Sequence, residues 1–346
     1  MVKKLIDKLE ADTRLSKEEW VCVFDDYSDD DRAYAAEKAR AVAHKYFGNK
    51  IYIRGIVEFS NVCKNDCYYC GIRCSNSNAQ RYRLDDDDIL LCCDEGYEYG
   101  FRTFVLQSGE DYSAYPASRM AELVKRIKSA HPDCAVTLSL GEMEYEDLKL
   151  MRQAGADRYL LRHETATKEH YEKLHPAKMS FEHRMECLEN LKALGYQTGA
   201  GMMIGAPFQT NEYLANDMLF LREFEPHMIG TGPFLPHKDT PFKDMPKGSY
   251  ELTLFVLSLC RLMLPRVLLP ATTALGTISP QGREQGVLSG ANVIMPNLSP
   301  AQVRKKYMLY DGKICTEDSS DECRHCLTAR MKRIGYEIEV SRGDYK

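Results

Sequence analysis

The hydrophobic residues along the chain follow two alternating patterns. Short apolar runs rich in β-branched residues recur at strand length, and longer segments follow them in which apolar residues return every three or four positions. This alternation predicts repeated β/α units with a parallel sheet. We expect strands at 51–59, 103–107, 135–140, 158–162, 197–205, 228–233, 267–272 and 292–296.

The number and order of these units predict an α/β fold, a closed (β/α)8 TIM barrel. A barrel of this kind takes roughly 250 residues plus extensions, and the chain has 346. We expect the barrel over 49–298, an N-terminal helical extension over 1–48 and a C-terminal helical tail over 299–346. Functional residues should then follow the carboxyl ends of the strands.

Composition narrows the classes of partner. The net charge is −5, and the basic residues are scattered among acidic ones instead of forming a stripe, so we expect no nucleic-acid binding. No segment approaches the roughly 20 apolar residues that span a bilayer, and no secretory signal is recognisable. We therefore expect a cytoplasmic protein without membrane contact. Its 13 cysteines should be metal ligands and reduced thiols.

Three cysteines follow the first expected strand directly. Cys63, Cys67 and Cys70 stand at C-x3-C-x2-C spacing in NVCKNDCYYCG. A structural zinc site needs four ligands, and no nearby Cys or His completes this set at the usual spacing. A [4Fe–4S] cluster held by three thiolates leaves one iron open to a small molecule. The spacing therefore favours such a cluster over structural zinc or a chance grouping of thiols.

Polar residues also end two later strands. Arg162 and Glu164 follow the fourth strand two positions apart, and so on one side of it. They should project into the barrel mouth, as an internal ion pair or as ligand-binding groups, because unpaired burial is costly. Thr272, Thr273 and Ala274 end the seventh strand and offer hydroxyls and backbone N–H groups to an anion.

The triplet with its aromatic residue, Tyr69, resembles the signature of radical S-adenosylmethionine (SAM) enzymes. The wider chain, from about residue 50 to 330, resembles the HydE family, the radical SAM maturases of FeFe-hydrogenase. The blocks that carry this resemblance are SNVCKNDCYYCG, RYRL, VLQSGED, VTLSLGE, DRYLLRHETA, TGAGMMIGAP, GPFLPHKDTP, PATTALGT, GANVIMPN and LYDGKIC.

The resemblance implies an anaerobic enzyme that carries a [4Fe–4S] cluster and reductively cleaves SAM to methionine and a 5′-deoxyadenosyl radical. It further implies that the radical is directed at the sulfur of a cysteine-bound iron carbonyl-cyanide precursor during assembly of the diiron subcluster. The implied partners are the tyrosine-lyase and GTPase-scaffold maturases and a low-potential electron donor such as ferredoxin or flavodoxin.

Matching motif positions implies two sets of contact residues. Those expected to face SAM are Tyr69, Gln107, Gly109, Glu110, Ser139, Glu164, Arg184 and Met203. Those expected to face the substrate are Ser108, Thr137, Arg162, Thr272, Thr273, Ala274 and Tyr307.

A second group of cysteines, Cys315, Cys323 and Cys326, has C-x7-C-x2-C spacing. Its position matches that of an accessory [2Fe–2S] or [4Fe–4S] cluster, which is variable in the family and not needed for activity. Zinc is the alternative, because His325 lies between two of these cysteines as a candidate fourth ligand.

Two other functions stay open on the sequence. A different radical SAM enzyme, similar to methylornithine synthase or biotin synthase, would act on a small organic substrate; the second cysteine group favours HydE over this. A non-enzymatic iron–sulfur carrier or scaffold belongs to another class, and it would not need a barrel mouth lined with carboxylates.

Overall fold

The computed structural model describes residues 1–317 and 320–346, apart from the side chains at positions 321 and 323. Its strands are β1 (Lys50–Ile53), β2 (Gly55–Ser60), β3 (Thr103–Ser108), β4 (Ala135–Ser139), β5 (Arg158–Leu160), β6 (Gln197–Ala200), β7 (Met203–Ile204), β8 (Met228–Ile229), β9 (Gly232–Pro233), β10 (Val293–Ile294) and β11 (Glu337–Glu339). Its helices are α1 (Val2–Asp12), α2 (Lys17–Asp26), α3 (Asp29–Phe47), α4 (Asp86–Glu98), α5 (Ala117–Ala130), α6 (Tyr145–Gln153), α7 (Lys168–Leu174), α8 (Phe181–Ala193), α9 (Asn211–Phe224), α10 (Tyr250–Met263), α11 (Thr273–Ile278), α12 (Gly282–Leu288), α13 (Ala301–Arg304) and α14 (Ser320–Arg333).

The strands form a closed parallel barrel. A six-stranded sheet runs in the order β2-β3-β4-β5-β6-β8. Parallel backbone bridges then lead from Met228 of β8 to Leu268, and from Pro270 to Val293 of β10. Because β10 pairs with β1, and β1 continues into β2, the ring is complete. Each of the expected strand regions contributes to it, which confirms the predicted (β/α)8 fold class.

The helices on the outside follow the predicted periodic segments. Side chains of Asp85, Ser180, Thr210 and Ser249 accept hydrogen bonds from the first-turn backbone of α4, α8, α9 and α10, where they satisfy otherwise unpaired N–H groups. Periodicity alone did not predict the short helices α7, α11 and α12. Helices α7 and α11 lie in loops that follow strands, and these loops form the carboxyl-end face of the barrel. Helix α12 contacts α3 and α10 in the outer layer.

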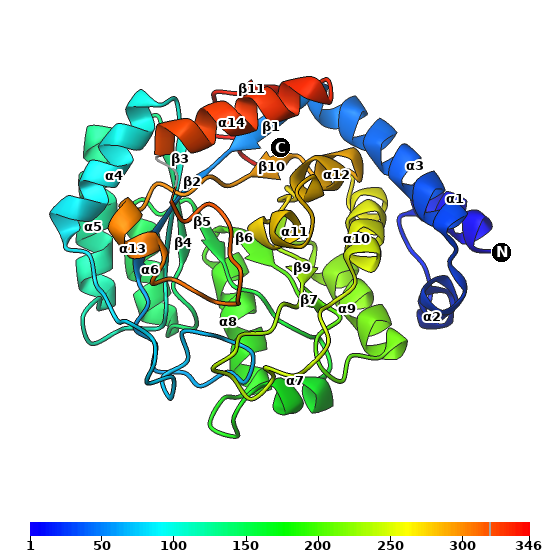
Figure 1. Ribbon diagram of the computed structural model, residues 1–346, viewed down its shortest axis with the longest axis horizontal. Helices are drawn as coiled ribbons and strands as arrows, with labels where there is room; N and C mark the ends of the chain where they lie inside the picture. Colours follow the sequence, from blue (N-terminus) through cyan, green and yellow to red (C-terminus); the bar gives the residue numbers. More distant parts are fainter. Residues whose placement is uncertain (318–319) are drawn as a thin grey trace.

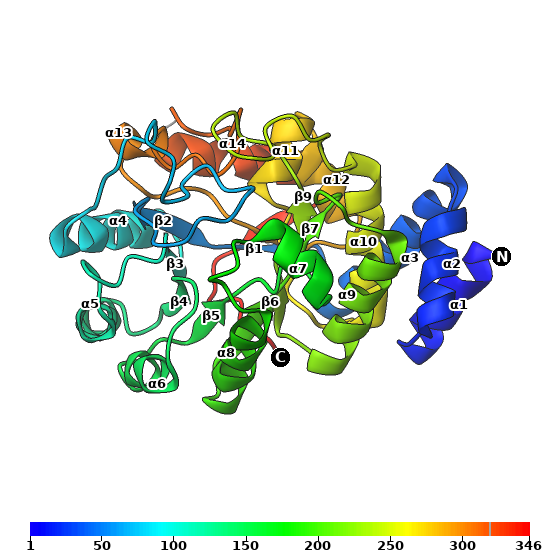
Figure 2. The same cartoon turned by 90° about the horizontal axis from the view of Figure 1, so that it is seen from below.

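The N-terminal extension is helical, as expected. Helices α1, α2 and α3 stand as a block beside α9 and α10 in both views (Figures 1 and 2). The face of α3 turned inward carries the buried Ala35, Ala39 and Ala43, whose small side chains permit close packing against α10. The extension therefore lies away from the cysteine loop and covers the apolar outer surface of the barrel helices.

The C-terminal tail contains α13 and α14, but it also contains the strand β11, which the expectation of a helical tail missed. Strand β11 pairs in parallel with Lys50–Tyr52 of β1. Strand β3 pairs with β2 from Gly55 onward and does not extend along β1. Without β11, backbone groups on this edge of β1 would be unpaired. In the part of the chain that the structure describes, no helix has the length and apolarity needed to cross a membrane.

The end of the chain closes the amino-end face of the barrel. The carbonyl of Arg342 accepts hydrogen bonds from Thr103 Oγ1, at 2.8 Å, and from Arg158 Nη2, at 2.7 Å. Arg158 is fully buried, and its Nη2 also lies 2.6 Å from Asp344 Oδ1. Arg54 reaches the Gly343 carbonyl at 3.5 Å. Residues 342–344 thus form a floor beneath the strands.

Candidate active site

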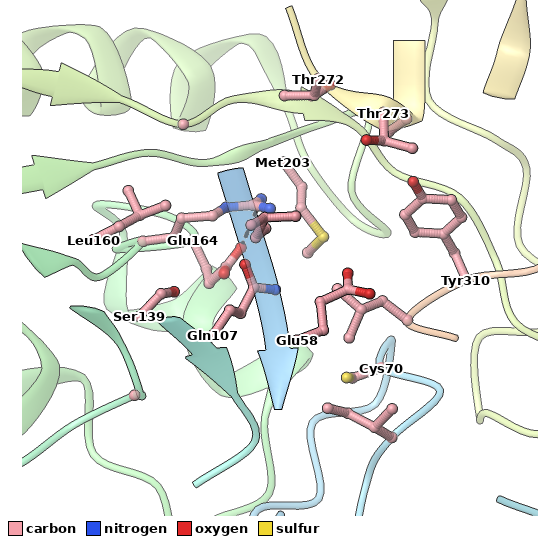
Figure 3. A pocket seen from close by; sticks show the side chains of 18 of the residues that line it. Glu58, Cys70, Gln107, Ser139, Leu160, Glu164, Met203, Thr272, Thr273 and Tyr310 are labelled. Carbon is pink, nitrogen blue, oxygen red and sulfur yellow. Dashed lines mark ion pairs between the residues drawn. The ribbon is translucent and has the colours of Figure 1, made fainter. Parts of the chain in front are cut away.

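A cavity of about 390 Å³ occupies the barrel between this floor and the loops at the carboxyl ends of the strands. Every residue that the sequence assigned to the cysteine triplet, to SAM or to the substrate lines this one cavity. In the view of Figure 3, Thr272, Thr273 and Tyr310 lie on one side of it, Ser139, Leu160 and Glu164 on another, and Gln107 and Met203 between them.

Cys63, Cys67 and Cys70 lie on the irregular loop after β2, and all three line the cavity. Neighbouring segments hold this loop through backbone hydrogen bonds, from Lys64 N to Glu110 O and from Gly71 N to Leu309 O, both 2.9 Å. Burial raises the pKa of each of the three thiols, in the case of Cys70 to about 12. Ionised thiolates at this position therefore need a cation such as the iron of a cluster.

The loop after β3 approaches the cysteine loop closely. A Cβ atom at Gly109 would lie 2.3 Å from the Val62 carbonyl oxygen and 2.7 Å from Cys63 Cβ, so only glycine fits. The next residue, Glu110, donates its backbone N–H to Cys63 Sγ at 3.4 Å. Its carboxylate accepts from Glu142 N at 3.1 Å, which fixes it at the cavity wall.

Arg162 and Glu164 meet at the end of the fourth barrel strand. Arg162 Nη2 and Glu164 Oε2 lie 3.0 Å apart as an ion pair, yet neither atom has a hydrogen-bond partner of good geometry in the described structure. Glu164 adopts φ 64°, a left-handed conformation that is costly for a non-glycine residue. The internal pair foreseen from the sequence exists, and it leaves bonding capacity toward the cavity.

Several other buried polar atoms at the wall lack partners among the described residues. They include Thr137 Oγ1, Thr272 Oγ1 and Arg162 Nε. Buried polar atoms in folded proteins are almost always hydrogen-bonded. A cavity with several unsatisfied hydroxyl and charged groups fits a polar ligand, and together with the three thiols it fits a cluster with bound SAM.

Tyr69 and Arg184 are held by neighbours that the sequence did not single out. The Tyr69 hydroxyl lies 3.1 Å from His175 Nε2, and His175 Nδ1 lies 2.9 Å from the Tyr171 carbonyl. Burial, aided by the positive charge of Arg184, lowers the pKa of His175 to about 3, so its neutral ring donates from Nδ1 and accepts from Tyr69. Arg184 Nε donates to Glu142 Oε1 at 2.5 Å.

The predicted SAM and substrate sets are not separate groups in the structure. Gln107, assigned to SAM, donates from Nε2 to the hydroxyl of Tyr307, assigned to the substrate, at 3.2 Å. Ser108 points back to the Gly109 carbonyl at 2.7 Å. The two expected ligand sites therefore share a wall formed by the end of β3 and by residue 307.

The polar cavity residues that sequence reasoning missed include Arg54, Glu58, Tyr310 and Lys313. Glu58 Oε1 lies 2.6 Å from Lys313 Nζ, and Glu58 Oε2 accepts from Asn297 Nδ2 at 2.8 Å. Arg54 and Glu58 alternate with Ile56 on the inner face of the first strand, so charged residues inside an apolar strand were the available signal. Lys313, in the tail, carried no such signal.

Of the second cysteine group, Cys315 and Cys326 do not line this cavity. Cys315 is half-buried and its Sγ lies 3.5 Å from Arg283 Nη2, whereas Cys326 is exposed on α14. The side chain of Cys323 lies outside the described residues. Among the side chains that the structure does describe, no three His, Cys, Asp or Glu residues gather as a metal site. The accessory cluster and its zinc alternative stay predictions.

The closed barrel and the three cysteines at the first strand-to-helix loop define a radical SAM enzyme, and residues 57–221 match the Radical SAM superfamily. Within that superfamily the chain belongs to the HydE family of [FeFe] hydrogenase maturases. It is 46% identical to the [FeFe] hydrogenase maturase subunit HydE of Thermotoga maritima, over 86% of this chain and 84% of that protein. The family implies a [4Fe–4S] cluster and SAM, and it sets aside a non-enzymatic carrier.

Solved structures share the architecture. Methylornithine synthase (PylB) matches with a TM-score of 0.84 and 27% identity, over 97% of both chains. The [FeFe]-hydrogenase maturase HydG matches with a TM-score of 0.81 over 98% of this chain and 76% of that one. At 19% identity, the HydG match concerns the fold alone.

Proposed function

We propose that this chain is a hydrogenase maturase that acts on the sulfur of a cysteine-bound iron carbonyl-cyanide precursor. The observation that carries this proposal is that the cysteine triplet and all the residues implied for SAM and for the substrate line one cavity. When bound, the cluster supplies the electron that cleaves SAM to methionine and a 5′-deoxyadenosyl radical. The protein supplies binding, orientation and exclusion of water.

We assign the binding of SAM to the cysteine-loop end of the cavity. The rigid Glu110 carboxylate would accept from the SAM amino group, and Glu164 would accept from the ribose hydroxyls. Arg184 is close to this end and could pair with the methionine carboxylate, although it already binds Glu142. Tyr69, Ser139 and Met203 would complete the contacts, with Met203 lying against the adenine.

We assign the carboxylate of the amino-acid substrate to Arg162 and to nearby hydroxyl groups of the cavity wall. Arg162 is permanently charged and has unsatisfied donors, and Thr272 has an unsatisfied hydroxyl. Thr273 and Ala274, at the start of α11, offer backbone N–H groups beside them. Thr137, Ser108 and Tyr307 would contact the remainder of the substrate.

The proposal includes partners and a compartment. A tyrosine-lyase maturase would deliver the precursor, a GTPase scaffold would receive the product, and a ferredoxin or flavodoxin in the cytoplasm would donate the electron. The second cysteine group would hold an accessory metal that catalysis does not need.

A second candidate, a methylornithine-synthase-like reaction on an ordinary amino acid, is favoured by the match to PylB along nearly the whole chain. Anaerobic incubation with either the iron–cysteine complex or free amino acids separates the two candidates. We expect the iron–cysteine complex to accelerate SAM consumption. If only an amino acid does so, the maturase proposal is wrong.

The enzymatic core of the proposal is tested by dithionite-driven formation of 5′-deoxyadenosine after anaerobic reconstitution. We expect Cys67→Ala to abolish cleavage and Cys323→Ala to retain most of it. Cys74→Ala is a matched control, because Cys74 follows the triplet closely but is exposed and does not line the cavity. Equal losses in the Cys67 and Cys323 variants would refute the division of roles.

A further inference from the structure

One arginine outside the cavity lining makes an unusual set of contacts with the cysteine loop. Arg81 donates from Nη1 to the carbonyl oxygens of Asn61, at 2.6 Å, and Ile72, at 2.8 Å. From Nη2 it donates to the carbonyl oxygens of Arg73, at 2.6 Å, and Asn76, at 3.2 Å. One planar guanidinium thus bonds to four backbone positions of a segment without regular secondary structure.

These carbonyls lie on both sides of the triplet. Asn61 precedes Cys63 by two residues, and Ile72 follows Cys70 by two. The guanidinium therefore connects the two ends of the loop that carries all three thiols. Because the donors of arginine have a fixed planar geometry, this connection fixes the separation of the loop ends.

Two asparagines reinforce the same connection. Asn61 is fully buried, and its Oδ1 accepts from the backbone N–H of Tyr82, the residue after Arg81, at 2.9 Å. Asn76 Nδ2 donates to the Gly71 carbonyl at 2.7 Å. The loop is thus held in its shape by protein contacts that do not involve the thiols.

Arg81 also differs from the neighbouring arginines in its ion pairing. Arg73 forms a two-bond pair with Asp66, at 2.6 Å for each bond, and Arg83 pairs with Asp111. Arg81 forms no ion pair with any residue that the structure describes, and the oxygens that accept from its guanidinium are backbone carbonyls. A positive charge near an iron–sulfur cluster favours the reduced cluster, which is the more negative state.

We propose that Arg81 is a positioning residue of the cluster centre, which holds the cysteine loop in its binding shape and raises the reduction potential of the cluster through its unpaired charge. This role concerns the cluster and not the substrate. It requires a cluster on the triplet, but it does not depend on which molecule the radical attacks.

Two substitutions separate the geometric role from the electrostatic one. Arg81→Gln removes the charge and most of the donors, whereas Arg81→Lys keeps the charge and loses the planar fork. Arg40→Gln is the control, because this substitution removes the same net charge. Arg40 is exposed on α3, on the outside of the barrel. Each protein is reconstituted anaerobically under identical conditions.

The readouts are iron and sulfide per chain, the midpoint potential from an EPR-monitored redox titration without SAM, and the melting temperature of the cluster-free protein. For Arg81→Gln we expect less iron bound and a midpoint potential more negative than that of the wild type. For Arg81→Lys we expect the wild-type potential with a reduced iron content. Arg40→Gln should match the wild type in both.

Several results would overturn the proposal. A wild-type midpoint potential in Arg81→Gln would refute the electrostatic role. Full iron content in both variants would refute the geometric role. If the Gln variant binds no cluster, a Lys variant with a shifted potential contradicts the charge argument. If neither variant binds a cluster, an unchanged melting temperature of the cluster-free protein supports the local role. A large fall in melting temperature shows that Arg81 instead holds the fold as a whole.

Discussion

Glu164 combines backbone strain with an unsatisfied carboxylate oxygen at the wall of the cavity. Strain of this kind costs on the order of 1–3 kcal/mol and persists where the surroundings enforce it, often at binding sites. In this conformation the carboxylate lies beside Arg162 at the cavity wall. This is the local reason for assigning Glu164 to the ligand.

We predict that Glu164→Gln weakens SAM binding by about 10-fold to 100-fold, because hydrogen bonds to a charged acceptor contribute about 1.5–3 kcal/mol. Equilibrium dialysis of reconstituted protein measures this. Glutamine keeps the same backbone requirement, so the effect reports the lost charge. The exposed Glu144→Gln should bind SAM as the wild type does. Unchanged affinity in the Glu164 variant would exclude it from the SAM site.

The Glu58–Lys313 pair joins the first barrel strand to the tail across the cavity wall, with both side chains less than a tenth exposed. We predict that Lys313→Met destabilises the cluster-free protein by about 3 kcal/mol, because it leaves a buried carboxylate unpaired. The double variant with Glu58→Gln should recover part of this loss. Denaturant unfolding gives the coupling between the two sites.

The exposed pair Lys168–Glu182 serves as the matched control for this cycle. Surface ion pairs contribute little, so its removal should have a small effect and almost no coupling. If the effects of the two buried substitutions simply add, the Glu58–Lys313 interaction does not stabilise the closed cavity.

Sequence reasoning identified the residues whose chemistry is visible in short motifs. The cysteine triplet and the polar groups that end strands, such as Arg162 and Thr272, could be found because spacing and strand position decide where they point. His175, Asn61 and Lys313 could not be found in this way. Their roles depend on contacts with residues far away in the chain, such as the bond from Asn61 Nδ2 to the Lys306 carbonyl.

At the scale of elements, the long helices and the barrel strands could be predicted, and the short helices and strand β11 could not. Helices such as α9 and α10 carry periodic apolar faces and capping hydroxyls that fix their limits locally. Strand β11 has little apolar character of its own, and the unpaired edge of β1 determines its conformation.

The segment after β11 gives a prediction that depends on pH. Burial raises the pKa of Asp344, but hydrogen bonds and charges from Arg342 and Arg158 outweigh it and hold the pKa at about 2, below its ordinary value of 3.8. Asp344 therefore stabilises the fold above about pH 4, and this contribution disappears as the pH falls toward 2. We predict that Asp344→Asn costs about 1–2 kcal/mol at pH 7.

Unfolding of the cluster-free protein at several pH values measures this contribution. The difference between wild type and Asp344→Asn should shrink by about half between pH 7 and pH 3. A difference that stays constant with pH would show that the carboxylate charge contributes nothing, and that Asn replaces its hydrogen bonds only imperfectly.

At the scale of the whole molecule, the closed barrel followed from the count and order of strand patterns. Parallel strands with intervening helices have few ways to bury both faces, and a ring of eight is one of them. The closing contacts were not predictable, because they depend on isolated bridges such as Met228 to Leu268 and on the chain end beneath the strands. These are long-range contacts without a local signature.

The floor formed by residues 342–344 bears on the order in which ligands enter and leave the cavity. The cavity extends from Arg54, which touches Gly343, to the cysteine loop, and residues 342–344 cover its end near Arg54. Under the proposed placement of SAM at the cysteine-loop end, we expect the molecule at the end near Arg54 to bind before SAM. We also expect its product to leave after methionine and 5′-deoxyadenosine.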